Sequence, residues 1–154
     1  MTTKSSGFSL VELLVVVAIL GTISAIGIVS YQGYIKGSRQ SSAESIMQQI
    51  ALAQTEEYSN TGSYYTQGAC DTTTIISEAD MTDLSGEIES NLFSNENIID
   101  DSIGYQMCIA ETGSSFTVVA SNIGPDATKP YCKVTLSAQG AWNRGAGGTV
   151  CPRE

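Results

Sequence analysis

The chain has 154 residues, with 16 acidic side chains, 7 basic side chains and no histidine, so its formal net charge at pH 7 is −9. The length fits one domain, or one domain with a long helix. The negative charge argues against general nucleic-acid binding, which needs a basic surface. Without histidine, Ser-His-Asp and Cys-His catalytic sites are excluded, and we predict neither an enzyme nor a metal or cofactor site.

The first seven residues form a short polar leader that contains Lys4 and ends at Gly7. They are too short for a secretory signal peptide, whose apolar region alone takes about 7–15 residues. Residues 8–30 are predominantly apolar and long enough to span a bilayer, which takes about 20 helical residues. Glu12 lies inside this segment, where a charge costs roughly 2.5–3.5 kcal/mol and therefore needs a partner.

These residues resemble the N-terminus of type IV pilins and pseudopilins over residues 4–31. In that family the leader ends in Gly, Phe usually follows, and Glu is the fifth residue of the apolar helix. Gly7, Phe8 and Glu12 match this pattern. The resemblance implies that a prepilin peptidase cleaves after Gly7 and that Phe8 becomes an N-methylated first residue. It also implies that Glu12 meets the N-terminal amine of a neighbouring subunit during assembly.

The spacing of apolar residues predicts that the helix continues beyond the membrane. Residues 35–58 contain no proline, and apolar side chains recur near the helical period. These are Ala43, Ile46, Met47, Ile50, Ala51, Leu52 and Ala53. The segment 60–62 ends in a glycine that can adopt a left-handed cap. We therefore expect one long helix over residues 8–58, with 8–30 lying in a membrane or in the core of a filament.

Residues 59–154 are expected to form a disulfide-stapled globular head. A short helix is predicted near residues 77–92. Strands are predicted at 104–111, 115–121, 131–137 and, more weakly, 140–143. An antiparallel meander of these strands on the long helix would bury both apolar faces. The fold class is therefore α+β, and the layout resembles the type IV pilin fold.

The four cysteines, Cys70, Cys108, Cys132 and Cys151, all follow the apolar segment. If that segment crosses a membrane, they lie outside the cytosol, where disulfides persist. Two bridges are expected, and four cysteines allow three pairings. The resemblance to pilins favours Cys132–Cys151 as the closure of a C-terminal loop, with Cys70–Cys108 as the second bridge. Trp142 is expected to pack this loop onto the sheet.

The resemblance implies a type IV pilus subunit that polymerises into surface filaments for adhesion, twitching motility or DNA uptake. Its partners would be other copies of the chain, a prepilin peptidase, an inner-membrane assembly platform and a secretin. The chain would be a single-pass inner-membrane precursor before it enters an extracellular pilus.

Two alternatives remain open. Many bacterial pilins carry a proline where this chain has Val29, and this departure slightly favours a minor pilin or a type II secretion pseudopilin. Outside the family, the alternative is a single-span periplasmic binding protein that does not polymerise.

Overall fold

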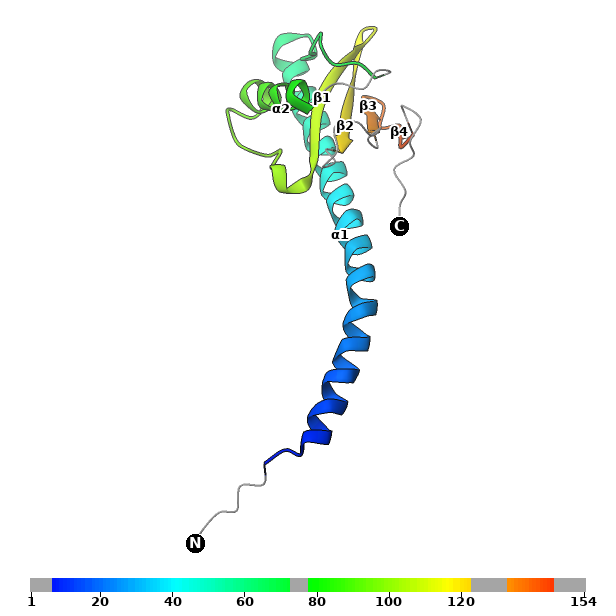
Figure 1. Cartoon of the computed structure of the whole chain (residues 1–154). Coiled ribbons are helices and arrows are strands. Elements are labelled where there is room, and N and C mark those ends of the chain that lie inside the picture. The colour runs from blue at the N-terminus through cyan, green and yellow to red at the C-terminus, as the bar shows by residue number, and fades with distance from the viewer. Residues whose placement is uncertain (1–6, 73–77, 123–132, 146–154) are drawn as a thin grey trace. The chain divides into compact units, whose positions relative to one another are not determined.

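The computed structural model describes residues 7–72, 78–122 and 133–145. Its elements in chain order are α1 (Leu10–Thr61), α2 (Glu78–Leu92), the 3-10 helix η1 (Asp101–Ile103), β1 (Tyr105–Thr112), β2 (Ser115–Asn122), β3 (Lys133–Ser137) and β4 (Trp142–Asn143). The strands form one antiparallel sheet in the order β1-β2-β3-β4, as Figure 1 shows, which confirms the predicted α+β meander. The chain divides into two compact units, of which the first ends at Lys36 and the second begins at Gly37.

The ends of the elements follow the turn residues in the sequence. Gly62 adopts a φ of +80°, and its N–H donates to the Tyr58 carbonyl oxygen at 2.9 Å, so α1 ends at the predicted stop. The β1–β2 hairpin has a two-residue loop whose first residue, Gly113, has a φ of +65°. A type II′ turn needs such a positive φ at that position. Of the predicted strand 131–137, residues 131 and 132 lie outside the described part.

The main core of the second unit lies between α1 and one face of the sheet. Met47 and Ile50 of α1 are completely buried in the same cluster as Met107, Ile109 and Val118. These strand residues alternate along β1 and β2, so one face of the sheet points at the helix.

From the sequence we placed the wrong residue on the buried face of α1 near its C-terminal end. Leu52 is 72% exposed, whereas Gln54 is fully buried. Gln54 lies seven residues after Met47 and therefore continues its row on the helix. Its amide binds the backbone of Tyr65 in both directions, with Nε2 donating to the carbonyl oxygen at 2.6 Å and Oε1 accepting from the N–H at 3.0 Å. A buried polar side chain is tolerated there because its hydrogen bonds are made.

The free edge of β1 is covered by side chains rather than by another strand. The Met107 N–H donates to the Ser85 hydroxyl of α2 at 2.9 Å. The Ile109 N–H donates to Oε1 of Gln67 at 3.0 Å, and the Gln67 N–H donates back to the Ile109 carbonyl at 2.9 Å. An exposed strand edge is a template for pairing with other chains. This cover therefore removes β1 as a site of strand addition.

The expected Cys70–Cys108 disulfide is present beside this edge, with a Cα–Cα distance of 5.7 Å. Both cysteines are buried with Met81 and Leu84 of α2 against the second face of the sheet. The expected Cys132–Cys151 bridge lies outside the described residues.

A salt bridge ties the C-terminal segment to α1 within the second unit. Arg144 donates to both carboxylate oxygens of Glu44, from Nε at 2.8 Å and from Nη2 at 3.0 Å. The guanidinium carbon of Arg144 lies 5.3 Å from the centre of the Trp142 ring. Trp142 is half-buried against the main core, which agrees with the expected packing role of this residue. Such a bidentate pair fixes orientation as well as distance.

We predict that Arg144→Lys and Glu44→Gln each lower the free energy of unfolding by about 1 kcal/mol, because each removes the two-point contact. Urea unfolding of the full chain in detergent measures the effect. The double variant is expected to lose less than the sum of the two single variants. Losses that simply add would contradict a stabilising pair.

We predict that Cys70→Ala combined with Cys108→Ala lowers the free energy of unfolding by about 4 kcal/mol. The bridge joins residues separated by 38 positions, and its loss frees that loop in the unfolded chain. The same urea measurement applies. An unchanged unfolding midpoint would contradict a stabilising bridge.

Candidate processing and assembly site

The expected cleavage bond lies in exposed, non-helical chain just before α1. A Cβ atom added at Gly7 would meet nothing within 4 Å. Phe8 is 84% exposed, and the helix begins only at Leu10. A protease needs an accessible, extended backbone. This placement of Gly7 and Phe8 meets that need.

Glu12 lies in a capping box with Ser9. The Ser9 N–H donates to Oε2 of Glu12 at 2.9 Å, and the Glu12 N–H donates to the Ser9 hydroxyl at 3.2 Å. This reciprocal pair satisfies two of the backbone donors that a helix start leaves unpaired. From the sequence we predicted a role for Glu12 in assembly, but we did not predict its role in capping the helix. The sequence contains the pattern that predicts this role, because Ser-x-x-Glu before an apolar run is typical of a capping box.

The carboxylate of Glu12 keeps capacity for a further partner. An ionised carboxylate offers about four acceptor sites, and Glu12 uses one of them for Ser9. The positive end of the helix dipole also favours a negative charge in this turn. A cation can therefore bind Glu12 without displacing its own cap.

The first unit exposes apolar side chains on every side of the helix. The large apolar residues from Phe8 to Ile28 are each 49–84% exposed. Among the described residues, α1 is the helix that is long and apolar enough to cross a membrane. Its hydroxyl groups are satisfied within the helix, since Thr22 and Ser24 donate to the carbonyls of Ile19 and Leu20. Such a surface needs lipid or other apolar chains around it.

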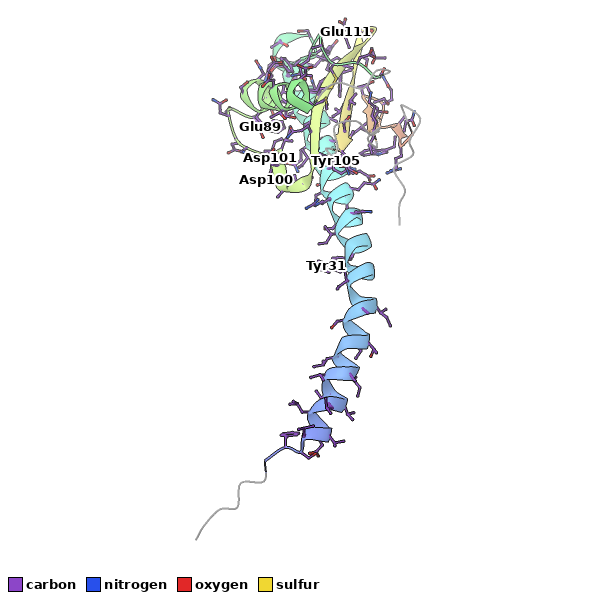
Figure 2. The ribbon with its side chains drawn as sticks, viewed as in Figure 1. Tyr31, Glu89, Asp100, Asp101, Tyr105 and Glu111 are labelled. Carbon is purple, nitrogen blue, oxygen red and sulfur yellow. A yellow bond between two sulfur atoms is a disulfide. The ribbon has the colours of Figure 1, made fainter. Side chains whose placement is uncertain are left out.

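The adjacent acidic residues Asp100 and Asp101 form hydrogen bonds with nearby residues. Asp100 caps η1 by accepting from the Ser102 N–H at 2.6 Å, and Asp101 accepts from Nε2 of Gln106 at 3.0 Å. Figure 2 places both aspartates beside the start of β1. The hydrogen bond from Ser102 lowers the pKa of Asp100. These contacts explain the two residues as supports of the turn into β1.

The comparisons with known proteins agree with the N-terminal geometry. Residues 2–28 match the family described as the prokaryotic N-terminal methylation motif. A "Fimbrial protein" of Neisseria meningitidis serogroup A / serotype 4A (strain DSM 15465 / Z2491) is 32% identical over 87 residues, which are 56% of this chain and 48% of that protein. Both matches make the chain similar to type IV pilins, the first over its N-terminal segment and the second over about half its length. The chain spans about half the length of this curated relative. No solved structure matches the chain.

This similarity to pilins gives the observed features a common interpretation. A long N-terminal helix with a small antiparallel sheet is the α+β arrangement of the pilin fold. The leader and the apolar helix fit a membrane-anchored precursor of a fimbrial subunit.

Proposed function

We propose that this pilin-like chain is the structural subunit of a type IV pilus. The observation that carries the proposal is the apolar surface of α1 from Phe8 to Ile28, which stays exposed among the residues that the structure describes. Lipid covers this surface in the precursor. Other copies cover it in the filament, so one segment serves as anchor and as filament core.

Processing creates the charged group that assembly uses. A prepilin peptidase hydrolyses the Gly7–Phe8 bond, which leaves a carboxylate on Gly7 and a free amine on Phe8. The amine of Phe8 then takes a methyl group from an electrophilic methyl donor and releases one proton. The methylated nitrogen still carries a positive charge, because a secondary amine is basic. The mature subunit is residues 8–154.

Glu12 selects the position of each new subunit. Its carboxylate is the acidic group of the apolar segment, and a buried charge among apolar helices is tolerated only when paired. The amine of Phe8 from a neighbouring copy supplies the partner. Glu12 keeps its bond to the Ser9 N–H, so the first helical turn stays intact while the ion pair forms.

The remaining partners follow from this route. The precursor is a single-pass protein of the inner membrane. An inner-membrane platform extracts it into the filament, and the filament crosses the outer membrane through a secretin. On the cell surface the filament serves adhesion, twitching motility or DNA uptake. A minor pilin or a type II secretion pseudopilin is the second candidate, and Val29 at the usual proline position favours it.

We predict that Glu12→Gln lowers the yield of sheared surface filaments by about tenfold or more, because the subunit amine loses its counter-charge. Glutamine also serves in a capping box, so membrane insertion, leader removal and helix start should stay normal. The measurement is the amount of the chain in the sheared fraction, compared with the membrane fraction.

The matched control is Glu56→Gln, which makes the same charge change at an exposed position of α1. It should leave the filament yield unchanged. A normal yield from Glu12→Gln would contradict the assembly role of this carboxylate.

A further inference from the structure

We propose that the second unit binds a small neutral saccharide in a groove between the end of α1 and the β1–β2 hairpin. We call this the Tyr58 groove. Its volume is about 310 Å³, and its lining includes Tyr58, Tyr64, Glu111, Gly113, Ser114 and Ser115. This volume is at the lower end of the range for small-molecule sites, about 300–1,000 Å³.

The groove forms where two buried rows of side chains end in polar residues. On α1 the buried row of Met47, Ile50 and Gln54 reaches the half-exposed Tyr58 one turn later. On β1 the inward row of Met107 and Ile109 reaches Glu111 two residues later, and Glu111 is exposed. The helix and the sheet therefore stop packing against each other at this end.

Tyr58 provides a fixed aromatic platform in the groove. Its ring stacks on Tyr64 with 4.6 Å between centroids and 27° between planes. Tyr64 packs in turn on the buried Phe116 at 4.9 Å. The ring of Tyr58 is thus held from one side while the residue stays 48% exposed. The C–H face of a pyranose ring is apolar and flat, and it packs well on such a ring.

Hydroxyl groups and one carboxylate surround this platform. Glu111 pairs with Phe116 across the hairpin, which places its carboxylate on the same side of the sheet as the tyrosines, and Figure 2 shows Glu111 at the hairpin end of β1. Ser114 and Ser115 add hydroxyls that both donate and accept. A Cβ atom at Gly113 would meet nothing within 4 Å, so the rim stays open there.

The composition of the groove selects a neutral saccharide over other ligands. Among the described residues, its lining contains no lysine or arginine and one carboxylate, and the whole chain has a net charge of −9. An anionic ligand would be repelled. A multivalent cation would lack the several carboxylates that it needs. Sugar hydroxyls need mixed donors and acceptors beside an apolar face, which is what Tyr58, Glu111 and the serines provide together.

Saturation-transfer NMR on the full chain tests the proposal. The protein is kept unassembled in a zwitterionic detergent that contains no sugar, and maltose, lactose and N,N′-diacetylchitobiose are the probes. At least one probe should receive saturation on its ring C–H protons. Tyr58→Leu should lower that signal by about fivefold, because the flat platform is lost. Glu111→Gln should weaken binding by about threefold, because it removes a charged acceptor.

Tyr34→Leu is the matched control, because Tyr34 is an exposed tyrosine of the first unit. It should leave the saccharide signal unchanged. No transfer to any of the three probes, or an equal signal from Tyr58→Leu, would overturn the proposal. Spermidine is added in a separate sample as a cationic probe, and its saturation without that of any saccharide would also overturn the proposal and would identify a cation site.

If Tyr58→Leu fails to fold, the saccharide titration of Glu111→Gln decides alone, and unchanged binding overturns the proposal. The readout uses unassembled subunits. Its result is therefore independent of whether Glu12 acts in filament assembly.

Discussion

The apolar surface of α1 between Phe8 and Ile28 is the constraint on which the rest of the molecule depends. These side chains have no cover within the first unit, and water is a poor solvent for so many of them. The Ser9–Glu12 capping box bonds two backbone donors at the helix start, and the hydroxyls of Thr22 and Ser24 donate to backbone carbonyls, whereas the charge of Glu12 still needs a counter-ion. The segment can therefore move from lipid to a bundle of helices without breaking its own hydrogen bonds.

The second unit carries its own core, so its stability does not depend on where the apolar segment lies. Gln67 takes the place of a further strand beside β1, because its Oε1 accepts from the Ile109 N–H and its backbone N–H donates to the Ile109 carbonyl, while the Gln54 amide binds the Tyr65 backbone in both directions. The covered edge of β1 suppresses strand-to-strand association. In the function that we propose, the contacts between copies are made by the apolar segment of α1 rather than by this strand edge.

The sequence predicted α1, α2 and the first two strands closely. Glycines follow the ends of α1 and β1, whereas α2 ends before Ser94 and Asn95, which adopt positive φ. Local patterns do not show contacts between distant residues, such as the pairing of Arg144 with Glu44. Lys133 is the clearest example. A lysine in a short strand is expected at the surface. Lys133 is instead 3% exposed, and its Nζ donates to the carbonyls of Asp71 and Thr72. Burial lowers the pKa of this amine. The Tyr58 groove could not be predicted from the sequence either, because its residues come together only when the end of α1 lies beside the β1–β2 hairpin.

The most direct test of the account is the intact mass of the main protein in filaments sheared from the cell surface. The account predicts residues 8–154 with one added methyl group and without the four hydrogens that two disulfides remove. A chain that still begins at Met1 would contradict processing at Gly7. A processed chain found only in the membrane fraction would contradict its role as the pilus subunit.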